Sequence, residues 1–333
     1  MMEQKYSETA YDSNNIPLSE PSELKQTVFG KFKLANADRL NFNRISGQVP
    51  YSLSEEIELD DYKDRKMASP WDHQNYTKGK ANLGLALFYF IGVSTETFLK
   101  FFLPLTILSL IMGYTVLYLD GNHNHPDAQM SFQALFYFSC IFYGSSALFQ
   151  LYYHKIAGRN GKVPFFMKIR KDYELCRQTG QVHIYKKDKE VFAAPFHEFD
   201  CYLASNPGNY GEIFYTMRLI HRYNGSKHTV DLGALLGFTA PIEEYYQLWN
   251  MMQQYMDISR PMPDNIMSEA YRHLDPTTAA YDKETGRDSH FWRNMDEEQY
   301  QAELKRRANE QQSIPLQAED ILRWKKPDEP FVA

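Results

Sequence analysis

The sequence predicts an α+β chain with membrane helices, in which a two-helix transmembrane hairpin precedes a small antiparallel β domain and a closing helix. Three patterns predict this order. Two long uncharged apolar runs lie within residues 81–154, and short alternating segments typical of strands begin near residue 162. An amphipathic helical pattern then covers residues 241–258. Polar regions, 1–80 and 261–333, flank this part of the chain.

The composition limits the classes of partner. The chain has 333 residues, enough for about two domains, and a formal net charge of −6. With a pI near 6.0 it has no general attraction to phosphate backbones, so nucleic acid is not an expected partner. Its mean hydropathy of −0.54 conceals the concentration of apolar residues between Leu83 and Tyr153.

The N-terminal region, residues 1–80, is polar and irregular, with prolines at 17, 21, 50 and 70, and we expect it to be partly disordered. It has neither a basic start nor an apolar core, so it is not expected to be a secretory signal peptide. Its acidic run Glu55–Asp61 is typical of a solvated segment.

The membrane region, residues 81–154, contains two predicted spans. Phe101–Leu119 is uncharged and about 28 Å long as a helix, and Phe132–Tyr153 is about 33 Å long, so each can cross a hydrocarbon core of about 30 Å. The preceding segment, about 82–100, contains Glu96 and Lys100, which would pair on one face of a helix. We expect this segment to be an interfacial helix or a cytosolic lead-in to the first span.

Lysine and arginine residues predict the orientation. The loop between the spans, residues 120–131, contains neither type. Basic residues flank the pair on both sides: Lys78, Lys80 and Lys100 before it, and Lys155, Arg159, Lys162, Lys168, Arg170 and Lys171 after it. By the positive-inside rule both termini are predicted to be cytoplasmic and the loop to face outward. The second group could also engage anionic lipid headgroups.

The loop contains the string GNHNHPD. His123, His125 and Asp127 are weak candidates for metal ligands, because two or three ligands on a flexible loop bind weakly. A nuclease centre needs a ββα scaffold that this loop cannot build. We therefore expect a surface turn and no metal.

Small residues in the spans allow two interpretations. Gly144-Ser145-Ser146-Ala147 in the second run, and Gly113 in the first, could admit a neighbouring helix and support a homo-oligomer. Packing within the hairpin is the favoured alternative for the second run.

The soluble region, residues 162–260, predicts about five antiparallel strands followed by a helix. Gly180 and Gly225 mark turns, and Pro195 interrupts one of the segments. The apolar stripe of the helix is expected to comprise Tyr245, Leu248, Trp249, Met252 and Met256. This is the element order of a pleckstrin-homology-like (PH-like) barrel capped by its C-terminal helix, although other α+β sheets with a covering helix fit almost as well. In the polar tail, 261–333, only a short charged helix at Asp296–Gln312 is expected.

A short internal echo links two segments. FNRISGQV at Phe42–Val49 shares Arg, Ser/Thr, Gly, Gln and Val with LCRQTGQV at Leu175–Val182. A duplicated strand–turn–strand is one explanation, and chance similarity over eight residues is the favoured one.

No pattern indicates catalysis or a cofactor. The nucleotide-binding, hydrolase and zinc-protease motifs do not occur in the sequence. The three cysteines, Cys140, Cys176 and Cys201, contain no C-x-x-C spacing and favour neither a disulfide framework nor a zinc site. The sequence therefore predicts a non-enzymatic protein.

In this chain the hairpin is followed by Arg177, Thr179, Gly180 and Val182, and then by Trp249 in a helix that ends near Arg260-Pro261. This combination resembles an uncharacterised family of bacterial two-pass inner-membrane proteins over about residues 82–264. The resemblance implies an inner-membrane protein associated with type VI secretion, acting as an immunity or accessory protein that binds a toxic effector or secretion component. It assigns no functional residues. The alternative from the residues alone is a membrane-tethered lipid- or signal-sensing module.

Overall fold

The computed structural model forms two compact units, Met1–Gly79 with Lys171–Ala333 and Lys80–Arg170, here called the sheet unit and the hairpin unit. The structure describes residues 6–20, 28–29, 32–33, 37–55, 59, 72–81, 83–121, 126–157, 169–208, 211–223, 225–236 and 240–325.

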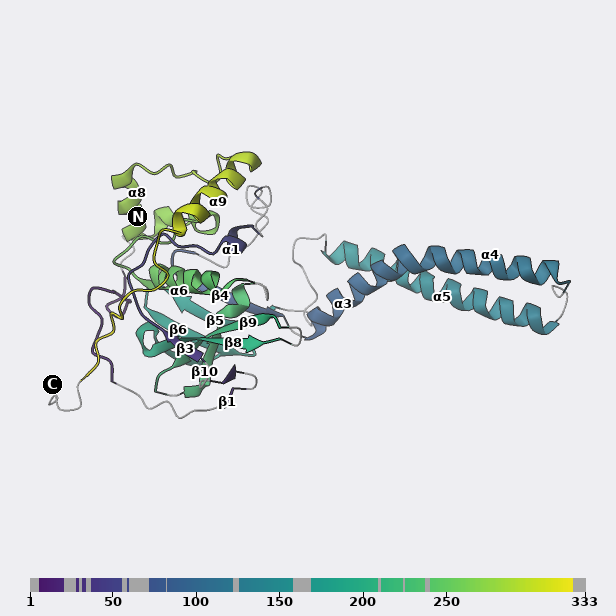
Figure 1. Ribbon diagram of the computed structural model, residues 1–333, viewed down its shortest axis with the longest axis horizontal. Helices are drawn as coiled ribbons and strands as arrows, with labels where there is room; N and C mark the ends of the chain where they lie inside the picture. Colours follow the sequence, from purple (N-terminus) through teal and green to yellow (C-terminus); the bar gives the residue numbers. More distant parts are fainter. Residues whose placement is uncertain are drawn as a thin grey trace. The chain divides into compact units, whose positions relative to one another are not determined.

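Two four-stranded antiparallel sheets form the centre of the sheet unit (Figure 1). The first has the order β10-β9-β8-β3, with β3 Ala37–Leu40, β8 Phe199–Pro207, β9 Ile213–His221 and β10 Gly225–Asp231. The second has the order β4-β5-β6-β7, with β4 Asn75–Ala81, β5 Ile169–Cys176, β6 Gln181–Lys186 and β7 Lys189–Pro195. A short pair, β1 Val28–Phe29 and β2 Phe32–Lys33, is separate from both.

The strands expected after the hairpin are present, and there are six of them rather than about five. Pro195 ends β7, and the 3₁₀ turn Phe196–Glu198 separates it from β8, because proline cannot donate a ladder hydrogen bond. The antiparallel α+β class is therefore confirmed for the described residues.

The N-terminal region differs from the expected polar, partly disordered flank. Strand β3 pairs with β8, with Leu40 opposite Cys201, and β4 lies beside β5. Tyr11, Ile16 and Phe42 are buried in the same core as both sheets. These apolar residues stand singly among polar ones without a period, so the sequence pattern did not identify them. Two strands of these sheets, β3 and β4, therefore lie outside the expected domain 162–260.

Helix α6, Ile242–Met256, confirms the predicted apolar stripe, because Tyr245, Leu248, Trp249, Met252 and Met256 are all buried. Its opposite face is buried as well. The Asn250 side chain donates to Gln48 Oε1 at 2.6 Å, and Gln253 Oε1 accepts from the Asn43 backbone at 2.7 Å. The helix is thus covered on its polar side by a segment from the other end of the sequence.

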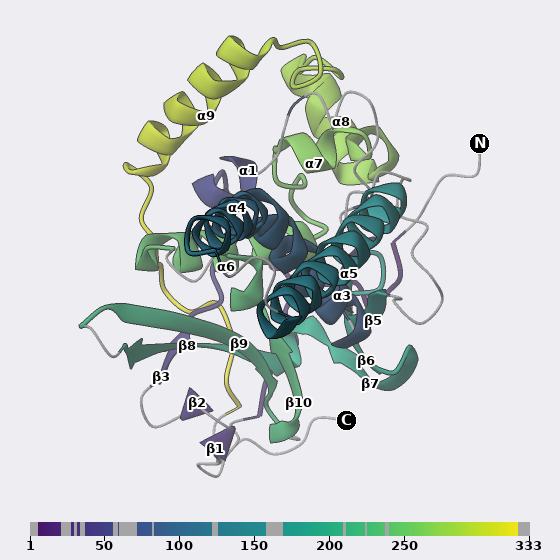
Figure 2. The same cartoon turned by 90° about the vertical axis from the view of Figure 1, so that its right-hand side faces the viewer.

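The region after residue 261 is largely helical. It contains α7 Ile266–Glu269, α8 Pro276–Thr285 and α9 Glu297–Gln311, and α1 Tyr51–Glu55 precedes β4 in the chain. A second apolar cluster joins Leu59, Ile266, Trp292, Tyr300 and Leu304. Figures 1 and 2 both place α6 between the strands and the pair α8 and α9. The helix expected at Asp296–Gln312 is confirmed as α9, but the region around it is packed structure rather than a tail.

The hairpin unit consists of two antiparallel helical segments. The first comprises α3 Leu83–Thr97, a π-helix at Phe98–Phe102 and α4 Leu103–Leu119, and the second is α5 Pro126–Ala157. The expected interfacial helix and first span are therefore continuous. Residues 126–131, expected in the loop, form the first turns of α5, which Pro126 begins because its missing N–H is tolerated there.

Candidate functional site: an apolar helical hairpin

Both segments of the hairpin unit are long and apolar enough to cross a membrane: Leu87–Leu119 with 33 residues and Gln129–Lys155 with 27. No residue is buried in the most apolar window of the first, and 17% are buried in that of the second. Leu105, Phe138 and Ile141 are 61%, 67% and 73% exposed. A core helix of a water-soluble protein would be mostly buried, whereas these helices expose their apolar side chains.

A narrow inner seam joins the two segments. On the first segment its residues recur at spacings of four and three: Phe88, Gly92, Thr95, Leu99, Leu103, Thr106 and Leu110. On α5 the buried or half-buried positions are Phe132, Ser139, Tyr143, Ser146, Phe149, Gln150 and Tyr153. The step from Leu99 to Leu103 is one residue longer than a heptad allows, and it crosses from the π-helix into the first residue of α4. The π-helix therefore keeps α4 facing α5 after the extra residue.

Polar side chains in this seam bond to each other. Thr106 Oγ1 lies 2.6 Å from the Tyr143 hydroxyl, and Gln150 Nε2 donates to Thr95 Oγ1 at 2.7 Å and to the Gly92 carbonyl. A Cβ at Gly92 would overlap the Tyr153 ring, so the glycine permits the close approach. Hydrogen bonds between helices are the means by which membrane helices satisfy polar groups. The regular spacing of these polar and small residues along both helices is the sequence signal for the seam.

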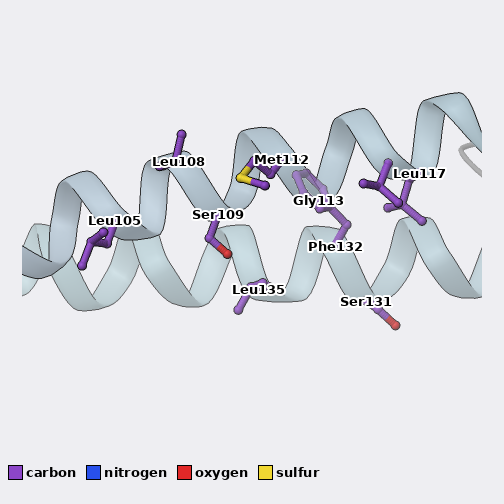
Figure 3. A pocket seen from close by; sticks show the side chains of 10 residues that line it. Leu105, Leu108, Ser109, Met112, Gly113, Leu117, Ser131, Phe132 and Leu135 are labelled. Atoms are coloured by element: carbon purple, nitrogen blue, oxygen red, sulfur yellow. The ribbon is translucent and has the colours of Figure 1, made fainter.

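The outward surface carries a groove of about 730 Å³ between α4 and the start of α5 (Figure 3). It is lined mainly by apolar side chains, including Leu105, Met112, Phe132 and Leu135. Gly113 lines it as well, and Gly113 and Gly144 have no atom within 4 Å of an added Cβ. Of the four small residues at 144–147, only Ser146 is buried in the seam, so packing within the hairpin does not explain Gly144.

Only some of the residues predicted to contact lipid headgroups belong to the described part of the chain. Lys155, Arg170 and Lys171 are exposed, whereas Arg159, Lys162 and Lys168 lie outside the described residues. Lys171 Nζ is 3.1 Å from Glu174 Oε2 and lies over the Tyr185 ring. This ion pair neutralises one of the charges assigned to lipid contact.

The candidate metal ligands are not brought together by the described part of the chain. His123 and His125 lie outside it, and Asp127 is exposed in the first turn of α5. Within the described ranges no group of three His, Cys, Asp or Glu side chains has metal-binding geometry.

The motif residue Arg177 is completely buried and organises the sheet unit. Its guanidinium donates to Asp275 at 2.8 and 3.1 Å, and to the carbonyls of Asp257 and Arg260 at 2.8 Å each. It also donates to the carbonyls of Gln254 and Tyr255 in the last turn of α6, where helices leave acceptors unsatisfied. Burial lowers the pKa of Arg177, but the Asp275 carboxylate outweighs it and raises the pKa overall. Asp275 is 98 positions away in the chain, so no local pattern could identify it.

The neighbouring motif residues are structural too. Gly180 has φ +69° at the turn between β5 and β6, and Val182 is fully buried. The Thr179 carbonyl accepts from Thr9 Oγ1 at 2.8 Å. Trp249 is buried between Phe42 and Phe196, and its Nε1 donates to the Asn41 carbonyl at 2.8 Å.

The echo between Phe42–Val49 and Leu175–Val182 does not correspond to a repeated hairpin. Residues 41–50 contain no strand, whereas 175–182 join β5 to β6. Only the glycine conformation is shared, with φ +75° at Gly47 and +69° at Gly180.

The strand histidines and cysteines have packing roles. His228 stacks on Phe192 with centroids 3.9 Å apart, and His221 Nε2 lies 3.1 Å from Glu198 Oε2. Burial lowers the pKa of His197 and raises that of the Cys201 thiol, which holds the thiol protonated and poorly reactive.

The exposed hairpin surface is therefore the strongest functional feature of the described residues. Comparison of this chain with models of known protein families, with curated proteins and with solved structures found no match.

Proposed function

We propose that this chain is a non-enzymatic protein of a bacterial inner membrane, anchored by the hairpin unit with both termini in the cytoplasm. One observation carries the membrane assignment. The hairpin presents an almost continuous apolar surface to its surroundings, while its polar side chains at Thr95, Thr106, Tyr143 and Gln150 bond inside the seam. That distribution is the reverse of a water-soluble helix pair and suits a hydrocarbon solvent.

We propose further that the sheet unit binds a protein partner, as an immunity or accessory protein of a type VI secretion toxin. The resemblance carried by Arg177, Thr179, Gly180, Val182 and Trp249 supports this role. In this reading the sheet unit is a PH-like domain enlarged by β3 and β4. A lipid-sensing role has less support, because Lys171 already pairs with Glu174.

The role is tested by co-expression with candidate type VI secretion toxins taken from neighbouring genes. We expect cells producing the full chain to survive the toxin and the two proteins to co-purify from gently solubilised membranes. A matched variant, Leu105→Asp with Ile141→Asp, places charges on the apolar surface of the hairpin and leaves the sheet unit unchanged. We expect it to be lost from the membrane and to protect poorly.

Equal killing with and without the full chain, together with no co-purified toxin, would contradict the immunity proposal. Full protection by a variant that stays in the soluble fraction would instead contradict the need for the membrane anchor.

A further inference from the structure

One ion pair lies on the outward surface of the hairpin. Lys100 Nζ is 2.6 Å from Glu96 Oε1, which confirms the expected pairing on one helix face. The Lys100 side chain is 67% exposed, and the half-buried Glu96 side chain is 38% exposed. Lys100 lies within the π-helix, a type of segment often found at functional sites.

Contacts with α5 show where the Glu96–Lys100 pair lies along the hairpin. Thr95 bonds to Gln150, the Phe98 ring lies 5.9 Å from that of Phe142, and Thr106 bonds to Tyr143. The pair is therefore level with α5 residues between Phe142 and Gln150, inside the second apolar run, Phe132–Tyr153. The predicted spans 101–119 and 132–153 are staggered along the hairpin.

Tyrosines at the two ends of the hairpin support the same depth. Tyr89 and Tyr153 lie at one end, with rings 6.0 Å apart, and Tyr114 packs on Phe132 at the other. Tyr89 and Tyr114 are about 37 Å apart along the helix, close to the separation of the two membrane–water interfaces. Lys100 lies near the midpoint between them.

Exposure to lipid at this depth is unfavourable for both charges. A single charged side chain at the centre of a spanning helix is strongly unfavourable to insertion. Mutual pairing reduces this cost, yet the Glu96 contact uses one of the three N–H donors of the ammonium group. Such residues normally face other protein in the membrane.

The surface around the ion pair has the residue spacing of a helix–helix contact. Tyr89, Val93, Glu96 and Lys100 recur at spacings of four, three and four, which is a coiled-coil stripe beside the inner seam. Tyr89 and Val93 are 43% and 59% exposed. The stripe therefore offers apolar contacts next to the two charges.

We propose that a second copy of this chain covers the stripe, forming a parallel two-fold dimer through α3. The proposal rests on the proposed membrane insertion. Insertion with one orientation brings identical residues to the same depth across a two-fold axis. Glu96 of each copy then faces its counterpart and also packs one helical turn from Lys100 of the other copy, so the four charges form one neutral cluster. The surface is complementary to itself in charge, which selects a second copy as its occupant.

Charge reversal in the full-length chain tests this pairing. Glu96→Lys gives a stripe with two positive charges, and Lys100→Glu gives one with two negative charges. Using two affinity tags in gently solubilised membranes, we expect the wild-type chain to capture itself. We expect each reversed chain to lose self-capture at least tenfold and the two reversed chains, produced together, to capture each other.

Disulfide trapping provides a test that retains both charges. In a Cys140→Ser background, Val93→Cys should form a linked dimer when an oxidant is added to membranes, whereas Ile141→Cys on α5 should not. Monomeric wild-type chain together with no Val93→Cys dimer would overturn the proposal, as would undiminished self-capture of both reversed chains. Release of the wild-type chain by alkaline extraction would show that the membrane assignment itself had failed.

Discussion

Replacing Asp275 with asparagine is expected to lower the free energy of unfolding of the sheet unit by about 3–5 kcal/mol. Arg177 and Asp275 are both completely inaccessible to solvent, and the pair joins the β5–β6 turn to the start of α8. Removal of the negative charge leaves a buried guanidinium without its counter-ion. Asparagine keeps the shape and the N-cap hydrogen bond to Thr278, but its NH2 group cannot accept from Arg177 Nε or from the Tyr6 hydroxyl. The expected loss therefore combines the missing charge with these hydrogen bonds.

Chemical denaturation followed by tryptophan fluorescence measures this effect, because Trp249 lies in the core. Glu310→Gln is the matched control, since Glu310 pairs with Arg306 where both side chains are more than half exposed. An exposed pair contributes about 0–1 kcal/mol. Equal small losses in both variants would contradict the structural role of the buried pair.

The pH dependence of the free energy of unfolding should differ between the wild-type chain and Asp275→Asn. Burial raises the pKa of the Asp275 carboxyl, but Arg177 outweighs this and holds the pKa below its usual value. A carboxyl with a lowered folded-state pKa stabilises above its unfolded pKa of about 3.9, and this contribution is lost as the pH falls. We therefore expect the wild-type free energy of unfolding to fall more steeply below about pH 5 than that of Asp275→Asn.

Replacing Gly180 with alanine is expected to lower the free energy of unfolding by about 3 kcal/mol or more, a sum of two effects. The left-handed conformation at φ +69° is unfavourable for any residue with a Cβ. The added Cβ would also lie 2.5 Å from the Tyr11 nitrogen and 2.6 Å from the Thr9 oxygen. Both are backbone atoms, so the N-terminal segment would have to move.

Gly47→Ala separates the two effects. Gly47 has φ +75°, and an added Cβ would meet only the end of the Ile314 side chain, at 3.9 Å. We expect this variant to lose about 1–2 kcal/mol, which is the conformational part alone. Equal losses from the two substitutions would show that residues 9–11 do not pack on the β5–β6 turn.

The periodicity of apolar residues in the sequence predicted the elements in which one face is buried. The strands of 169–231 and the stripe of α6 follow from alternation and helical spacing, and the capping residue Asp296 sets the start of α9. The covering of α6 by residues 43–48, and the pairing of Arg177 with Asp275, depend on contacts between distant parts of the chain. No local spacing encodes such contacts.

In the hairpin, too, the sequence predicted the helices but not the contacts between them. Composition predicted two helices long and apolar enough to span a membrane. It placed the first span at 101–119, because Glu96 and Lys100 interrupt the apolar run before it. The stagger of the two helices depends on the seam contacts of Thr95, Thr106, Tyr143 and Gln150, which require the folded pair.

Accessibility of the hairpin tip tests the membrane assignment most directly. In a Cys140→Ser background, whose remaining cysteines Cys176 and Cys201 are buried, Asp120→Cys places one reactive thiol at the end of α4. We expect a membrane-impermeant maleimide to reach this thiol from the periplasmic side, while Lys189→Cys in the sheet unit reacts only after the inner membrane is broken. Labelling of Lys189→Cys in intact preparations, with Asp120→Cys shielded, would contradict the proposed membrane orientation.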